Sequence, residues 1–83
     1  MGGQIFVKNH CANTTIDVFV SKYTADGGND SWFSLKPGES DTWNRAAGGW
    51  ELVAFKVGNN RAGKYIKTGS SVGFYTLENI HVE

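Results

Sequence analysis

The sequence contains Thr15-Ile16-Asp17-Val18-Phe19-Val20-Ser21, in which large aliphatic residues occupy every second position. Because successive side chains of a strand point to opposite faces, this alternation predicts a β-strand with one buried face. Residues 4–9 alternate in the same way. Residues 50–57 carry apolar side chains on both faces, which predicts a strand in the centre of a sheet.

Clusters of Gly, Asn, Asp and Pro separate the alternating segments, and no segment shows the helical period. Residues 36–39 are typical of a β-turn, because Pro37 presets the backbone angle φ at its second position. Residues 24–30 predict a polar loop. We expect strands at residues 4–9, 15–23, 31–35, 40–45, 50–57, 61–66, 71–75 and 79–82. Seven or eight short antiparallel strands predict an all-β fold, a single β-sandwich or a partly closed barrel over residues 1–83.

The composition is that of one globular domain, with 83 residues of which 40% are hydrophobic and 19% charged. Cys11 is the single cysteine, so an intrachain disulfide is excluded and a reducing compartment is favoured. The N-terminal residues lack the basic start and apolar run of a secretory signal, and no run reaches the length of a membrane span. We therefore expect a cytoplasmic protein, with release by a non-classical route left open.

The charges exclude one class of partner, because eight basic residues balance eight acidic ones and no basic block stands out. Nucleic acid is therefore not expected to bind. His10, Cys11 and His81 occur outside any nucleophile elbow or metal-ligand motif, so we expect a protein that is not an enzyme and uses no cofactor. The acidic residues of the loop at 24–30 lack the calcium-loop pattern, so no metal is expected.

Residues 40–45 carry the clearest candidate binding site. In an extended strand Asp41, Trp43 and Arg45 project to one face. An indole beside charged groups can stack against the apolar face of a sugar while the charges contact its hydroxyl groups. The same residues could instead form a structural ladder, with Arg45 paired to Asp41 or Glu51. The full set of predicted ligand-binding residues is Asp41, Trp43, Asn44, Arg45, Trp50, Glu51, Arg61 and Tyr65.

Aromatic residues make up 13% of the chain, and Trp32, Trp43 and Trp50 lie close together in the sequence. A core of this size accommodates one or two tryptophans. We therefore expect at least one of the three to be partly exposed, at a binding site or an interface between molecules.

Two segments resemble the first half of small fungal β-sandwich proteins of the aegerolysin and lectin type. They are Ile5-Phe6-Val7-Lys8-Asn9-His10-Cys11-Ala12-Asn13-Thr14-Thr15-Ile16 and Leu35-Lys36-Pro37-Gly38-Glu39-Ser40-Asp41-Thr42-Trp43-Asn44-Arg45. The opening is also similar to that of thaumatin-like proteins. Aegerolysins are longer, and thaumatin-like proteins carry disulfides that this chain cannot form. The resemblance implies a cytoplasmic fungal defence or recognition protein that binds a glycan or a membrane lipid.

Three hypotheses follow. The first is a lectin-like module with Trp43 as stacking platform, Asp41, Asn44 and Glu51 as hydroxyl partners and Arg45 as orienting group. The second is recognition of a membrane lipid or glycolipid through exposed aromatic side chains. The third is a self-assembling protein, a homodimer whose aromatic residues form its interface.

Overall fold

The structure, a computed structural model, describes residues 3–24, 27 and 30–82. This part of the chain forms eight β-strands. Their bounds are β1 Gly3–Asn9, β2 Ile16–Val20, β3 Phe33–Leu35, β4 Ser40–Arg45, β5 Trp50–Val57, β6 Asn60–Lys67, β7 Ser71–Thr76 and β8 Asn79–Val82. Every predicted strand is present, and the bounds of β4, β5 and β8 are those that the sequence predicts.

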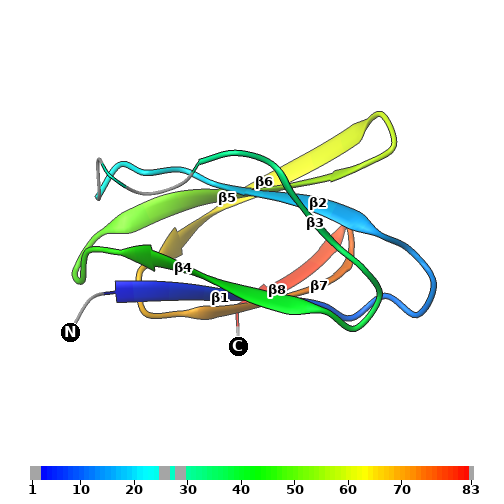
Figure 1. The fold of residues 1–83 in the computed structure, drawn as a ribbon, viewed down its shortest axis with the longest axis horizontal. Coiled ribbons are helices and arrows are strands. Elements are labelled where there is room, and N and C mark those ends of the chain that lie inside the picture. Colours follow the sequence, from blue (N-terminus) through cyan, green and yellow to red (C-terminus); the bar gives the residue numbers. More distant parts are fainter. Residues whose placement is uncertain (1–2, 25–26, 28–29, 83) are drawn as a thin grey trace.

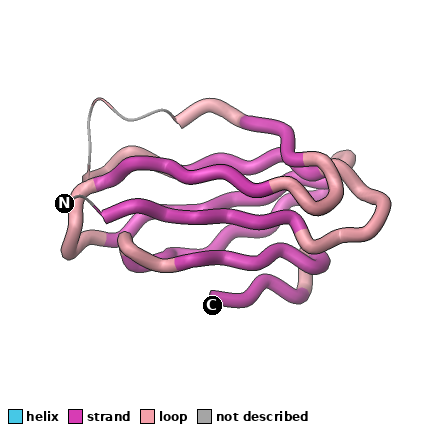
Figure 2. Tube along the Cα trace, turned by 60° about the horizontal axis from the view of Figure 1, so that its bottom comes forward, coloured by secondary structure: helices cyan, strands magenta, loops and turns pink. Residues whose placement is uncertain are grey.

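The strands form two four-stranded sheets, with the orders β4-β1-β7-β8 and β3-β2-β5-β6. Figure 1 shows the sheets as two layers. Figure 2 shows that the strands of both layers run roughly along the long axis of the molecule. The predicted all-β fold is therefore confirmed, and its form is that of a two-layer sandwich.

One pairing differs from the prediction that all strands are antiparallel. Strands β1 and β7 are parallel, with Phe6 opposite Ser71 and Val7 opposite Val72. The other pairings between described strands are antiparallel. Alternation shows which residues share a face, but it carries no information on the direction of the neighbouring strand.

Strand β2 is shorter than the predicted strand at residues 15–23. The N–H group of Ser21 still donates to the Leu52 carbonyl oxygen at 2.9 Å, but beyond it the backbone binds a side chain instead of a strand. The backbone N–H groups of Tyr23 and Thr24 donate to the carboxylate of Glu51 at 2.9 and 2.7 Å. Strand β3 likewise begins at Phe33 and not at residue 31. The polar loop predicted at residues 24–30 lies partly outside the described residues.

The core lies between the sheets and is built from the inward-facing side chains of both. Its buried members are Ile5, Val7, Ile16, Val18, Val20, Leu35, Trp43, Val53, Phe55, Ile66, Val72 and Phe74. Phe55 and Phe74 pack across the interior with ring centroids 4.9 Å apart. Burial of a large apolar side chain contributes roughly 1.5–3 kcal/mol, so these contacts hold the two layers together. The outer faces of the sheets are thereby presented to solvent on a rigid scaffold.

Candidate ligand-binding surfaces

Trp43, the predicted stacking platform, lies in the core with only 4% of its surface exposed. Its indole packs edge to face against Phe33, with ring centroids 6.0 Å apart. A sugar ring stacks on an exposed aromatic face. In this structure Trp43 presents no such face, whereas its neighbours Asp41 and Asn44 are exposed.

Arg45 shares the inward side of β4 with Trp43, and its side chain joins the two sheets. Its Nε and Nη2 groups donate to the backbone carbonyl oxygens of Ser21 and Val20, at 2.6 and 2.9 Å. Its Nη1 group donates to the carbonyl oxygen of Asn44 at 2.6 Å. The guanidinium thus satisfies carbonyl groups where β2 ends, in the sheet opposite its own.

Glu51 is fully buried at the start of β5. Its carboxylate accepts hydrogen bonds from the Ser21 hydroxyl at 2.5 Å and from the Thr24 hydroxyl at 2.5 Å. Burial alone would raise the pKa of Glu51, but the hydrogen bonds from Ser21, Thr24 and Tyr23 lower it below the ordinary value of 4.5. Because the carboxylate is ionised at neutral pH, it anchors the segment that follows β2.

A hollow of about 320 Å³ lies beside β4. Its lining residues are Gly27, Phe33, Asp41, Thr42, Trp43, Asn44 and Arg45. The structure therefore gathers Asp41, Trp43, Asn44 and Arg45 around one concavity. Their part in ligand binding stays a prediction, in which the exposed polar groups of Asp41 and Asn44 are open to a ligand.

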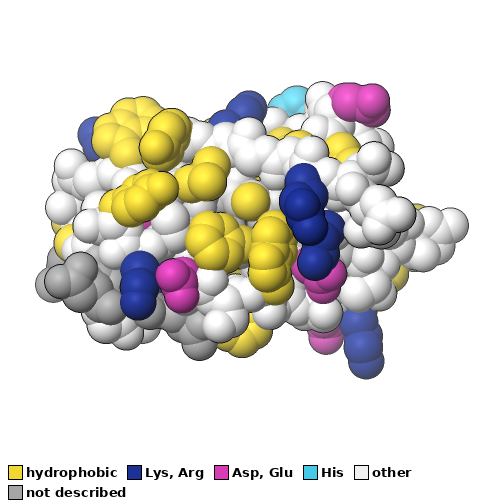
Figure 3. All heavy atoms as spheres, turned by 90° about the horizontal axis from the view of Figure 1, so that it is seen from above, with side chains coloured by type: hydrophobic (Ala, Val, Ile, Leu, Met, Phe, Trp, Pro, Cys, Tyr) yellow, Lys and Arg dark blue, Asp and Glu magenta, His cyan; other side chains and the backbone are white. Residues whose placement is uncertain are grey.

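The outward side of the β3-β2-β5-β6 sheet carries both exposed tryptophans of the chain. Trp50 is 55% exposed, Tyr65 62% and Trp32 40%. We call this surface the aromatic face; it consists of Phe19, Trp32, Trp50, Leu52, Ala54 and Tyr65. Figure 3 shows hydrophobic side chains gathered on this side of the molecule, with Lys and Arg side chains at one border.

The strand register determines which parts of the aromatic face carry large side chains and which carry small ones. Tyr65 lies opposite Leu52, while Ala54 lies between Phe19 on one side and Gly63 on the other. Because Gly63 has no side chain, larger groups surround a centre that carries only the Ala54 methyl group. The glycine also relieves crowding, since a Cβ atom there would lie 3.2 Å from Leu52 Cδ1.

Trp32 is held in place by two neighbours. Its ring centroid lies 5.5 Å from that of Phe19, with an interplanar angle of 43°. The Nζ atom of Lys56 lies 4.9 Å from the Trp32 ring centroid, a cation–π contact. A ring fixed in this way loses little conformational entropy when a ligand packs against it.

A row of polar and charged residues crosses the sheet at one end of the aromatic face. Ser34 pairs with Asp17, Asp17 with Lys56 and Lys56 with Arg61. We call these four residues the charged row. The Ser34 hydroxyl donates to Asp17 Oδ1 at 2.8 Å, which orients that carboxylate.

The outward side of the opposite sheet is more polar. Phe6, 37% exposed, stands on β1 next to Gln4, whose side-chain amide donates to Asn44 Oδ1 at 2.9 Å. Tyr75, on β7, stacks on His10 with ring centroids 4.5 Å apart. The exposed tryptophans therefore distinguish the aromatic face from the other side of the sandwich.

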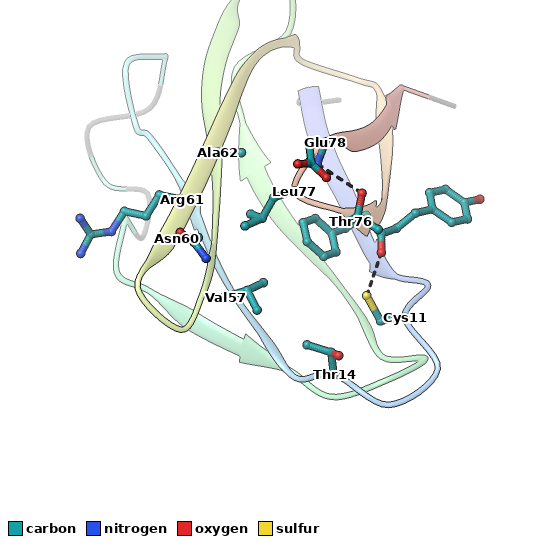
Figure 4. A pocket seen from close by; sticks show the side chains of 11 residues that line it. Cys11, Thr14, Val57, Asn60, Arg61, Ala62, Thr76, Leu77 and Glu78 are labelled. Carbon is teal, nitrogen blue, oxygen red and sulfur yellow. Dashed lines mark hydrogen bonds between the residues drawn. The ribbon is translucent and has the colours of Figure 1, made fainter.

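A second hollow, of about 630 Å³, opens between the β5–β6 and β7–β8 hairpins. Figure 4 shows Val57 and Leu77 directed into it, whereas the Arg61 side chain extends away. Cys11 also lines this hollow, and its thiol donates to the carbonyl oxygen of Tyr75 at 3.0 Å. The lining therefore combines apolar side chains with polar ones such as Asn60 and Glu78.

The structure brings together the two histidines, which are far apart in the sequence. His10 stacks on Tyr75 with an interplanar angle of 2°, and His81 packs edge to face on the same ring at 5.3 Å between centroids. Among the described residues there is no group of three or more His, Cys, Asp or Glu side chains that could hold a metal ion.

Three of the eight predicted ligand-binding residues, Trp50, Arg61 and Tyr65, lie on or beside the aromatic face. Sequence reasoning did not include Phe19, Trp32 or Lys56 among the ligand-binding residues, although Trp32 is one of the three tryptophans of which at least one was expected to be exposed. The signal for Phe19 was present, because it interrupts the polar side of the alternation in residues 15–21. Lys56 carried no such signal, and the tryptophan cluster did not show that Trp32 lies beside Lys56, since their proximity depends on how β2, β3 and β5 pair.

Within the described part of the chain, no helix is long and apolar enough to cross a membrane. Comparisons of this chain with protein-family models, with curated proteins and with solved structures found no match.

Proposed function

We propose that this protein is a carbohydrate-binding module without catalytic activity, and that the aromatic face is its binding surface. One observation carries the proposal: Trp50, Tyr65 and Trp32 are large, exposed rings on one side of a rigid sheet. Leaving such rings in water is unfavourable, so a surface of this kind is typical of a ligand or partner site.

The chemistry of the rings supports a sugar as the ligand. An aromatic ring has a negative face and accepts the weakly positive C–H groups on the apolar side of a pyranose. Trp50 and Lys56 are six residues apart on β5, so the surface extends over about 20 Å at 3.3–3.4 Å per residue. This extent favours an oligosaccharide over a single sugar.

Polar groups beside the rings provide partners for the sugar hydroxyl groups. The Tyr65 hydroxyl can donate or accept a hydrogen bond, and Lys67 lies opposite Trp50 in the register. The Asp17 carboxylate can accept hydrogen bonds in addition to the one from Ser34. Stacking would supply affinity, and these polar groups would set the orientation of the ligand.

Self-association through the same face is the second candidate. It is favoured by the continuity of Phe19, Leu52 and Ala54, which join the exposed rings into one apolar surface. Membrane-lipid recognition receives less support, because the two most exposed rings of the aromatic face, Trp50 and Tyr65, stand on strands β5 and β6 and not on a projecting loop that could reach headgroup depth. A glycolipid headgroup is a carbohydrate ligand and belongs to the first proposal. A role in fungal recognition or defence rests on the sequence resemblance alone.

A glycan array probed with the purified protein tests the proposal, with Trp50→Ala and Phe6→Ala probed in parallel. We expect the wild-type protein and Phe6→Ala to bind the same class of glycan, and Trp50→Ala to lose at least tenfold in affinity, about 1–2 kcal/mol for one stacked ring. Phe6 is the matched control, because it is an exposed aromatic residue on the opposite sheet.

Sedimentation equilibrium of the same samples distinguishes self-association, the second candidate function, from carbohydrate binding. A dimer that Trp50→Ala dissociates, together with an array on which no glycan binds, would replace carbohydrate binding by self-association. Binding to glycan that is unchanged in Trp50→Ala would place the site elsewhere, with the hollow beside β4 as the next surface to test.

A further inference from the structure

We infer that the ligand of the aromatic face is an acidic carbohydrate, whose carboxylate or sulfate group binds to Arg61 and Lys56 of the charged row. This inference rests on the proposed function, because it names the class of sugar that the same surface would take. Its basis is the distribution of charge around the aromatic rings.

The outward positions of the β3-β2-β5-β6 sheet carry an excess of positive charge. Lys56, Arg61 and Lys67 face outward on β5 and β6, whereas Asp17 is the one acidic residue at an outward position of the described strands of this sheet. The chain as a whole has a formal net charge of 0, so this surface is positive relative to the remainder. Such a field favours an anionic ligand.

The register concentrates this charge at the charged row. Lys56 lies directly opposite Arg61, and like charges at directly opposite positions destabilise a sheet. Asp17, on the other side of Lys56, offsets one of the two charges. In the described part of the chain the Arg61 side chain has neither a hydrogen bond nor an ion pair. A bound anion between Lys56 and Arg61 would turn the repulsion into two attractive contacts.

The position of the row relative to the rings suits a sugar acid. Lys56 is two residues beyond Ala54 on β5, a separation of about 7 Å along the strand. A sugar ring that packs over Ala54 would therefore hold an acidic substituent within reach of the Lys56 or Arg61 side chain. The guanidinium of Arg61 extends away from the hollow between the hairpins, as Figure 4 shows, and can bind a carboxylate or sulfate through two parallel hydrogen bonds.

Pairs of glycans that differ only in the acidic group test the inference. Suitable probes are sialylated and unsialylated N-acetyllactosamine, oligogalacturonate and its methyl ester, and sulfated and unsulfated N-acetyllactosamine. We expect the acidic member of at least one pair to bind at least tenfold more tightly at about 0.15 M ionic strength, since charge-assisted hydrogen bonds are about twice as strong as neutral ones. The preference should decrease as salt is added.

The variant Lys56→Gln/Arg61→Gln should reduce the ratio of acidic to neutral binding to about one. Lys36→Gln, which removes one exposed positive charge from the β3–β4 turn, should retain the ratio of the wild-type protein. Equal binding of both members of every pair would overturn the inference and leave carbohydrate binding intact. A preference that persists in the double variant would also overturn it. Absence of binding to every probe and to the broad array would remove the proposed function as well.

Discussion

Arg45 and Glu51 meet in the interior of the sandwich, where Arg45 Nε lies 3.8 Å from Glu51 Oε2 and both side chains are buried. Arg45 belongs to β4 and Glu51 to β5, so the pair joins the two sheets. A buried ion pair is costly to desolvate and is tolerated when hydrogen bonds satisfy the remaining polar atoms. The carbonyl groups of Val20 and Ser21 do this for Arg45, and the Ser21 and Thr24 hydroxyl groups do it for Glu51.

Glu51→Gln should strongly destabilise the fold. The amide would leave the Arg45 charge without its counter-ion. It would also place an NH2 group against hydrogen-bond donors that now meet a carboxylate oxygen. Breaking a buried ion pair in this way costs about 3–5 kcal/mol. Urea unfolding at pH 7 measures the change. Asp41→Asn is the control, because Asp41 is exposed, and it should change the free energy of unfolding by less than about 0.5 kcal/mol. Equal urea concentrations at the midpoint of unfolding for the wild type and Glu51→Gln would contradict the structural role of this carboxylate.

The contribution of Glu51 should also depend on pH. Hydrogen bonds lower the pKa of Glu51 in the folded state below its ordinary value of 4.5, so its stabilisation is fully present above that pH. It is lost progressively as the pH falls through the folded-state pKa, because the unfolded chain then binds the proton more readily. The difference in unfolding free energy between the wild type and Glu51→Gln should therefore shrink between pH 6 and about pH 3. A difference that is constant over this range would show that the ionised carboxylate is not the stabilising form.

The positions of the strands were predictable, because a period of two marks a strand regardless of its partners. The same period could not show which side of a strand faces the core. In residues 40–45 it placed Asp41, Trp43 and Arg45 on one side, and left open whether this side faces a sugar or forms a structural ladder in which Arg45 pairs with Asp41 or Glu51. The structure turns Trp43 and Arg45 inward, because the long Arg45 side chain reaches carbonyl groups where β2 ends. A carbonyl acceptor carries no side-chain signal in a sequence.

The aromatic face was predictable only in part for a related reason. Trp50 and Tyr65 were expected to contact a ligand, yet Trp32 shares their side of the sheet only because β3 pairs with β2 and β2 with β5. The parallel pairing of β1 and β7 could not be predicted from the sequence either, since the relative direction of two strands depends on long-range contacts. Sequence patterns fix local periodicity, and the composition of a surface depends on strand order.

The two tryptophans of the sequence-predicted site should respond differently to truncation. Trp43→Ala removes a core side chain and should cost about 3–5 kcal/mol, whereas Trp50→Ala removes an exposed one and should cost less than about 1 kcal/mol. Urea unfolding measures both. Because Trp43 is buried, iodide should quench the fluorescence of Trp32→Phe/Trp50→Phe, in which Trp43 is the one remaining tryptophan, less than that of the wild-type protein. Efficient quenching of that variant would show that Trp43 is open to solvent and restore it as a stacking platform.

Gly63→Val should test the shape of the aromatic face without removing any of its rings. The new side chain would stand opposite Ala54 and fill the centre between Tyr65 and Phe19. Its Cβ atom would lie 3.2 Å from Leu52 Cδ1, the flexible end of a side chain, so a small shift of Leu52 accommodates it. Because valine favours strands, the stability should change by less than about 1 kcal/mol.

Glycan binding by Gly63→Val should nevertheless fall at least tenfold, about 1.4 kcal/mol, because a sugar ring could no longer approach the Ala54 methyl group and the flanking rings together. Gly27→Val is the matched control, since a Cβ atom at Gly27 meets nothing within 4 Å. If Gly63→Val binds as tightly as the wild type while Trp50→Ala does not, the ligand contacts the Trp50 end of the sheet alone, and the acidic group cannot be held by Lys56 and Arg61 at the other end.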